Sequence, residues 1–380
     1  MLQTVSEIHM AQSLSLPDFD PIVHALLILA FLVHAIFMNL VVGGTVVMVI
    51  TDVIGMVAAR TCYHQLASVM SRWLPGFLGL AVVLGIFPLV FVQMMYKPIF
   101  MPALNLLGGL WVMALSAGLV GFGALYGYKH WRDSLSHQPA WYLSIGLLSI
   151  FMFLAVVWVF VVTSVLMLNP DQWSSVQNTG QWSVLNLPSL LPRFGHLVLA
   201  AVAGMGIFLV CYGLLMGSSH QGLTEDEPKE RYGTWIIQYG VAWTLAGTLP
   251  QIVIGPWLLL TLPDAVRGDL VSGQHFGSIA FFAALTTALL SLVLLNASLM
   301  VPHLKGLAIG GILSLGITIG FMVIVRHAVR VSWLSQHEMV GLVAQDRWEV
   351  LGVVFGILLL GLGLAIIMAK AHKKKTSAYR

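Results

Sequence analysis

Charged residues are scarce in this sequence. Only 9% of its 380 residues are Asp, Glu, Lys or Arg, whereas 58% are hydrophobic and the mean hydropathy is +0.91. This composition excludes a soluble globular chain of this length and indicates an integral membrane protein. Its expected surroundings are the lipid bilayer, and no nucleic-acid partner is expected.

Cysteine is nearly absent as well. Cys62 and Cys211 are the only two, and both are expected within membrane segments or beside them. A disulfide framework, a CxxC metal site and a CxxCH haem-attachment motif are therefore excluded. The N-terminal residues also lack the basic start and short apolar core of a secretory signal, so we expect the first hydrophobic segment to be retained.

Acidic residues are almost absent from the predicted membrane segments. Of the fifteen Asp and Glu residues, only Asp52 lies clearly within a predicted span, near its inner end. A proton pump, a carboxylate-dependent transporter or an oxygen-reducing site usually needs buried acids to carry protons. Their absence argues against all three classes.

Long apolar runs dominate what is present. Runs of about 20 residues, the length that spans a bilayer, predict an all-α membrane protein of about nine transmembrane helices. These segments begin near residues 22, 74, 103, 141, 194, 234, 276, 305 and 349. No internal repeat or composition shift divides the chain, so residues 1–380 are expected to form a single transmembrane domain.

Basic loop residues predict the orientation. The loops with Arg60 and Arg72, Lys129 and Arg132, and Lys229 and Arg231, together with the tail AHKKKTSAYR, fall on one side of a nine-span count. Because such loops stay cytoplasmic, the N-terminus is expected outside and the C-terminus inside. The expected location is the bacterial inner membrane. In the sixth segment, Pro250 and Pro256 predict a kink or a partly unwound stretch.

Histidines gather on the outer side of this predicted topology. The five concerned come from four segments, and they are His24, His34, His196, His275 and His327. A histidine at a helix end is usually a hydrogen-bonded interfacial residue, and this reading competes for each of them. It is weaker for His34 and His196, which lie inside apolar sequence. Imidazole is also a common ligand of haem iron, so His34, His196, His275 and His327 are candidate axial ligands.

Arginines accompany these histidines. Arg193 lies one turn before His196, Arg326 adjoins His327, and Arg330 follows one turn later. Guanidinium groups bind carboxylates through paired hydrogen bonds, which suits haem propionates, although these arginines could simply anchor helices at the interface. The alanines and glycines after His196 and His34 could form a wall for a flat macrocycle or serve helix packing.

Three stretches resemble a known family. ALLILAFLVHAIFMNLVVGG, GLAVVLGIFPLVFVQMMY and RFGHLVLAAVAGMGIFLVCYG are similar to helices of subunit I of the cytochrome bd quinol oxidases. The resemblance implies nine helices with the N-terminus outside and haem b toward the outer face, in two or more copies. It also implies that His34 ligates one haem and His196 another.

The sequence departs from this family at the oxygen and quinol sites. Val90 or Gln93 stands where the family has a glutamate, the arginine-tryptophan motif remains only as Arg330-Val331-Ser332-Trp333, and the quinol loop is reduced to DAVRGDLVSGQ. The expected methionine ligand is not evident, and His275 occupies about its region, where it could complete a bis-histidine haem b. The sequence thus keeps candidate haem ligands but shows no evident oxygen site.

The favoured function is therefore a bd-like membrane subunit that passes electrons between the quinone pool and a periplasmic redox partner, such as a c-type cytochrome. Axial ligands and burial would set the haem potentials, and other membrane subunits are expected partners. Whether this subunit is itself an oxidoreductase is left open. One alternative is the catalytic subunit of a bd-type quinol:oxygen oxidoreductase. Another is a transporter that uses the histidines as ligands for its cargo.

Overall fold

The computed structural model describes residues 21–132, 134–135, 138–216, 229–301 and 304–335. Within these ranges the regular structure is helical throughout, with no strand, which confirms the predicted all-α class. The ninth predicted segment, near residue 349, and the basic C-terminal tail lie outside the described residues.

Twelve α-helices and two short 3-10 helices follow one another along the described chain. They are α2 (Pro21–Ala58), α3 (Thr61–Met95), α4 (Lys97–Leu106), α5 (Gly108–Trp131), α6 (Pro139–Leu166), η1 (Pro170–Gln172), α7 (Trp173–Thr179), η2 (Gln181–Asn186), α8 (Leu190–Met216), α9 (Lys229–Thr248), α10 (Gln251–Leu260), α11 (Asp264–Val271), α12 (Phe276–Met300) and α13 (Lys305–Ser335).

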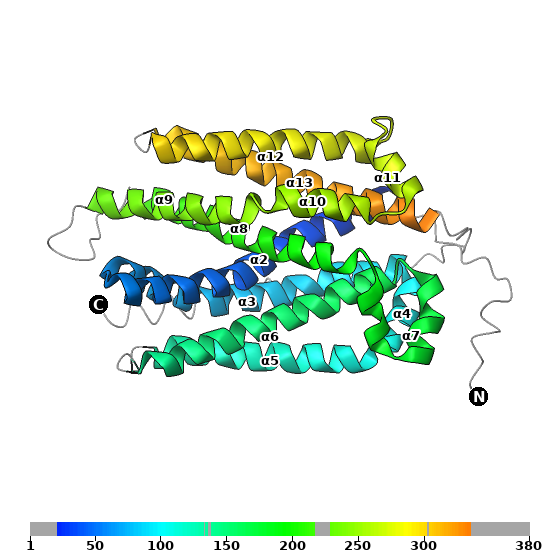
Figure 1. Ribbon diagram of the computed structural model, residues 1–380, viewed down its shortest axis with the longest axis horizontal. Coiled ribbons are helices and arrows are strands. Elements are labelled where there is room, and N and C mark those ends of the chain that lie inside the picture. The colour runs from blue at the N-terminus through cyan, green and yellow to red at the C-terminus, as the bar shows by residue number, and fades with distance from the viewer. Residues whose placement is uncertain (1–20, 133, 136–137, 217–228, 302–303, 336–380) are drawn as a thin grey trace.

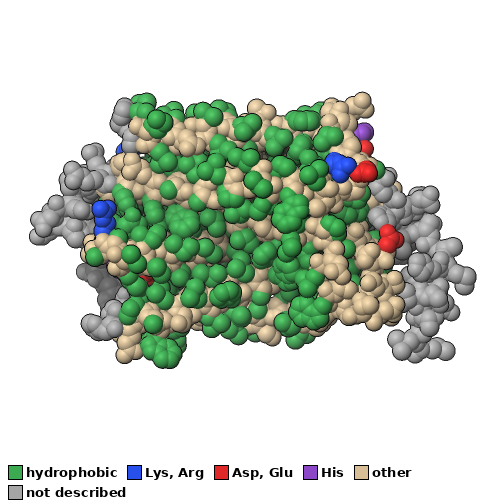
Figure 2. All heavy atoms as spheres, in the orientation of Figure 1, with side chains coloured by type: hydrophobic (Ala, Val, Ile, Leu, Met, Phe, Trp, Pro, Cys, Tyr) green, Lys and Arg blue, Asp and Glu red, His purple; other side chains and the backbone are tan. Residues whose placement is uncertain are grey.

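Eight helical segments of the described chain are long and apolar enough to cross a membrane, as the first eight predicted segments require. This is a multi-pass membrane protein. Figure 2 shows hydrophobic side chains over the middle of one face and charged side chains near its two ends. Helix α3 begins at Thr61, well before the predicted 74, because the helix continues past its apolar stretch into polar sequence.

The sixth segment is broken where its prolines predicted a kink. Helix α9 ends at Thr248 and α10 begins at Gln251, with Pro250 at the break and Pro256 inside α10. Proline has no backbone N–H and its ring clashes with the preceding turn. The two helices still form one membrane-length segment, from Tyr232 to Leu260.

The helices lie side by side as a bundle with two distinct ends (Figure 1). We call the end where α2 and α8 begin the Pro21 end; α4, α7 and α11 also lie there. The opposite end, where α2 finishes, is the Ala58 end. Helix α8 has a central position, because it contacts α2, α6, α9, α10 and α13.

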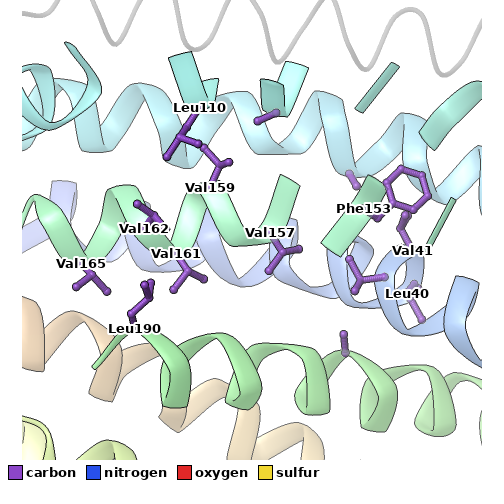
Figure 3. Packing of buried hydrophobic residues seen from close by; sticks show 14 of the residues in the cluster. Leu40, Val41, Leu110, Phe153, Val157, Val159, Val161, Val162, Val165 and Leu190 are labelled. Atoms are coloured by element: carbon purple, nitrogen blue, oxygen red, sulfur yellow. The ribbon is translucent and has the colours of Figure 1, made fainter. Parts of the chain in front are cut away.

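Branched aliphatic side chains fill the interior between α2, α5, α6 and α8 (Figure 3). Helix α6 supplies a series of buried valines, namely Val157, Val159, Val161, Val162 and Val165. They belong to one buried cluster with Leu40 of α2, Leu110 of α5 and Leu190 of α8. This packing fixes the relative position of the two helices, α2 and α8, that bear the predicted ligands His34 and His196.

Candidate functional site

The structure places all four predicted histidine ligands toward the Pro21 end. His34 lies in the first half of α2, His196 in the second turn of α8, His275 directly before α12, and His327 in the last third of α13. They come from four helices, as the sequence predicted. Their surroundings differ, however, and each is described separately.

His34 is held by helix α3. Its Nδ1 lies 3.0 Å from the carbonyl oxygen of Ala81, and because a carbonyl only accepts, Nδ1 carries the proton and donates it. The ring also lies against Gly85, where a Cβ would come within 2.8 Å of His34 Cε1. In the neutral ring this hydrogen bond leaves the lone pair on Nε2, the arrangement typical of a metal-ligating histidine.

His196 has a polar atom without a partner. Its Nδ1 is buried and has no hydrogen-bond partner among the described residues. An unsatisfied buried polar group costs about 1–3 kcal/mol, so an apolar packing role does not explain an imidazole at this position. A ligand that engages this ring would compensate for the missing protein contacts.

Helices α2 and α8 cross just beyond the two histidines. At Gly43 the helices approach so closely that a Cβ would collide with the Ala201 carbonyl oxygen. At a rise of 1.5 Å per residue, His34 lies ~14 Å and His196 ~8 Å before this contact along their helices. Both are therefore on the Pro21 side of the crossing.

The small residues near these histidines serve helix packing at several positions. Besides Gly43 at Ala201, a Cβ at Gly206 would collide with Thr244 of α9, and a Cβ at Gly44 would clash with Leu74 of α3. Close packing of small residues is a common device of membrane helices. These contacts support helix packing, one of the two roles that the sequence allowed, for Gly43, Gly44 and Gly206, because neighbouring helices fill the space beside them.

The three predicted arginines form a group, each beside an aromatic ring. Arg193 lies 5.5 Å from the Trp333 ring, Arg326 4.1 Å from the Phe31 ring, and Arg330 5.2 Å from the Tyr96 ring. The three guanidinium groups are close enough to repel one another electrostatically. Such ring contacts contribute roughly 0.5–2 kcal/mol each, which does not neutralise the charge.

No carboxylate of the described chain pairs with this group. Asp52, Asp264 and Asp269 form ion pairs with residues outside this group. Arg330 is only 6% exposed, and the buried Nε of Arg193 has no hydrogen-bond partner in the part of the chain that the structure describes. Buried charge is costly unless it is paired. The residues present therefore fit an anionic ligand beside His196, as the propionates of haem would be.

His327 and His275 already have protein contacts. His327 Nε2 lies 3.1 Å from Nδ1 of His24, so one of these rings donates to the other. His275 precedes α12 as its N-cap, forms a reciprocal capping box with Ser278, and lies 3.9 Å from Asp269 Oδ1. The His275 side chain is 63% exposed. These contacts match the helix-end role that competed with ligation for both residues.

Sequence reasoning did not single out Tyr96. This residue lies at the junction between α3 and α4, is 3% exposed, and faces Arg330. Its phenol O–H has no acceptor among the described residues. The available signal was a tyrosine beside the Lys97-Pro98 helix break, which is too common to identify a site.

A second polar cluster lies at the Ala58 end. The Asp52 carboxylate is fully buried and accepts hydrogen bonds from Arg132 Nε (2.8 Å), Arg132 Nη2 (2.8 Å), the Tyr128 hydroxyl (2.6 Å) and His64 Nδ1 (2.6 Å). The sequence showed Asp52 inside a span but not its partners. In the residues the structure describes, no three His, Cys, Asp or Glu side chains come together as a metal-holding group.

Comparison with solved structures identifies the fold. The chain superimposes on a chain in the structure of the bd oxidase from Geobacillus thermodenitrificans with a TM-score of 0.69, covering 93% of this chain and 98% of that one, at 11% sequence identity. This chain has a bd oxidase fold. The match confirms the remote resemblance noted in the sequence. No protein-family model and no curated protein matches the chain.

Proposed function

We propose that this protein is a bd-like membrane subunit that binds haem b and transfers electrons. The observation that carries the proposal is the group of Arg193, Arg326 and Arg330, buried or partly buried, which has no carboxylate partner among the described residues. Haem b would supply two carboxylates for the arginines and an iron that accepts the imidazole of His196. When bound, haem b supplies reversible one-electron transfer.

In this proposal His34 would hold one haem and His196 would hold another. The hydrogen bond from His34 Nδ1 to Ala81 fixes the ring orientation and directs Nε2 away from that carbonyl. The arginines orient the cofactor through its carboxylates, and the packed helices α2, α3 and α8 exclude water. His275 and His327 stay predictions as further ligands.

Electrons would pass between the quinone pool and a periplasmic redox partner, a c-type cytochrome or another metalloprotein. The bd oxidase fold supports a link to quinol and to other membrane subunits. The periplasmic redox partner stays a prediction from the sequence, in which Asp52 is the only acidic residue clearly within a predicted span. We further propose that the protein belongs to a bacterial inner membrane, with the N-terminus and the Pro21 end outside, and that it associates with other membrane subunits. Its basic loops support this orientation.

The decisive measurement is a reduced-minus-oxidised absorption spectrum of the purified protein, combined with haem extraction. We expect a b-type spectrum, and its absence would overturn the proposal and leave the transporter alternative. His196→Ala should abolish one low-spin b signal because the iron loses an axial ligand. His130→Ala is the matched control, since His130 is an exposed residue of α5 near the Ala58 end.

The alternative function is quinol:oxygen oxidoreduction, which the fold of the Geobacillus bd oxidase favours. In this chain Gln93 is exposed, with its amide 4.0 Å from Met101 Sδ, and provides no carboxylate for protons. Oxygen consumption with reduced quinol separates the two functions. Consumption that His34→Ala abolishes would establish the oxidase, whereas haem reduction by quinol without oxygen consumption supports electron transfer alone.

A further inference from the structure

Three hydrogen-bond donors at the Pro21 end, two of them buried and one partly buried, are linked through Arg330. Tyr96 comes from the α3–α4 junction, Arg330 from α13, and Arg193 from α8. Arg330 is the central member, because it lies over the Tyr96 ring and interacts electrostatically with Arg193. Neither the Tyr96 O–H nor the Arg193 Nε has an acceptor among the described residues.

The chemistry of these donors defines their partner. A phenol O–H and guanidinium N–H groups need acceptor oxygens, and two positive charges require a negative one. Burial raises the pKa of the Tyr96 phenol, against the opposing effect of Arg330, so Tyr96 stays protonated and donates. A single carboxylate offers about four lone-pair positions, enough for all three residues.

We propose that Tyr96, Arg330 and Arg193 together bind one haem propionate, and that Tyr96 is a positioning residue that sets the redox potential of that haem. This inference rests on the proposed function and adds to it a residue outside the histidine and arginine set. Tyr96 stabilises the carboxylate through a buried hydrogen bond, and Arg330 stabilises it through charge.

Loss of the Tyr96 hydroxyl should stabilise the ferric state of the haem relative to the ferrous state and so lower its redox potential. The propionate keeps its negative charge but loses a donor, and the positive ferric iron interacts more favourably with the less screened carboxylate. For Tyr96→Phe we expect full haem content and about a tenfold lower ferrous-to-ferric ratio at a fixed ambient potential, equivalent to ~59 mV for a one-electron couple. Arg330→Gln should shift the potential further in the same direction, and Arg330→Lys should partly restore it.

Redox-difference infrared spectroscopy of the holoprotein tests the identity of the anion. The haem propionates are labelled with 13C through carboxyl-labelled aminolevulinate, so bands that move with the label belong to haem. We expect Tyr96→Phe to shift these labelled bands. Tyr126→Phe is the matched control, because Tyr126 is 53% exposed on α5 and should leave both the bands and the potential unchanged.

The alternative anions give different results. If Tyr96→Phe alters only unlabelled carboxylate bands, an acidic side chain of the protein occupies the position and the inference is overturned. If inorganic phosphate, at constant ionic strength, raises the thermal stability of the wild type but not of Tyr96→Phe, a free or lipid phosphate occupies it, and the inference is again overturned. A preparation without any b-type spectrum instead refutes the proposed function and this inference with it.

Discussion

The two ends of the helix bundle treat buried arginine in opposite ways. At the Ala58 end, Arg132 donates two hydrogen bonds to Asp52, whose remaining acceptor positions are taken by Tyr128 and His64. At the Pro21 end, Arg193, Arg326 and Arg330 each lie beside an aromatic ring, and none of them pairs with a carboxylate of the described residues.

This difference separates a structural cluster from a ligand site. A closed network of four hydrogen bonds on one carboxylate needs nothing further, and it joins α2, α3 and α5. A group of buried and partly buried cations without an acid among the described residues is costly, and an anion supplied from elsewhere would reduce that cost. Charge balance, more than the number of polar residues, therefore indicates where a cofactor belongs.

The largest effect is expected from removing the acid of the closed cluster. Asp52→Ala removes the carboxylate partner of the largely buried Arg132 side chain, and breaking a buried ion pair typically costs about 3–5 kcal/mol of unfolding free energy. Thermal and denaturant unfolding of the purified protein measure the loss. Asp264→Asn is the control, because Asp264 is 92% exposed and its exposed pair with Arg267 should contribute little. A change below about 1 kcal/mol for Asp52→Ala would contradict the structural role.

A smaller effect is expected from giving the Pro21 end its own acid. Phe31 lies under Arg326 at 4.1 Å, so Phe31→Glu would place a carboxylate beside that arginine and make the end resemble the Asp52 cluster. This carboxylate would compete with a haem propionate, and a charge-assisted hydrogen bond contributes about 1.5–3 kcal/mol. We expect haem affinity to fall about tenfold or more, measured as haem retained per protein.

Phe31→Leu is the matched control for this substitution. It removes the aromatic ring without adding charge, so haem retention should remain close to that of the wild type. Equal losses of haem in Phe31→Glu and Phe31→Leu would show that the ring, and not the charge balance, maintains the site.

The smallest effect is expected at His275, on the exposed rim of the Pro21 end. If His275 were a haem ligand, His275→Met would raise the haem potential, because thioether ligation favours the reduced state. Its 63% exposure and its contacts with Ser278 favour capping instead. We therefore expect His275→Met to leave the potential unchanged and to cost about 0.5–2 kcal/mol of stability through the lost cap. A raised potential in a redox titration would establish ligation.

The sequence correctly predicted features that depend on the residues of one segment alone. The apolar runs predicted the eight membrane-length segments of the described chain, and Pro250 predicted the break between α9 and α10. Grouping of His34, His196, His275 and His327 at one end also followed from counting helices, because consecutive spans alternate in direction.

The reasoning was incomplete where two distant segments meet. Gly43 and Gly206 were candidates for a haem wall, whereas the structure uses them for contacts of α2 with α8 and of α8 with α9. His327 had no visible partner in the sequence, yet it bonds His24, 303 residues away. A single sequence does not reveal which faces of two helices touch.

The sequence by itself determined that this is a helical membrane protein, because the length and apolarity of a segment decide whether it can span a bilayer. It also determined that histidines and arginines lie toward one end. Only the tertiary structure decided that Asp52 neutralises Arg132, 80 residues away, and that Arg193, Arg326 and Arg330 have no such acid in the described chain. Neutralisation of a buried charge acts over a few ångströms in space, whatever the distance along the chain.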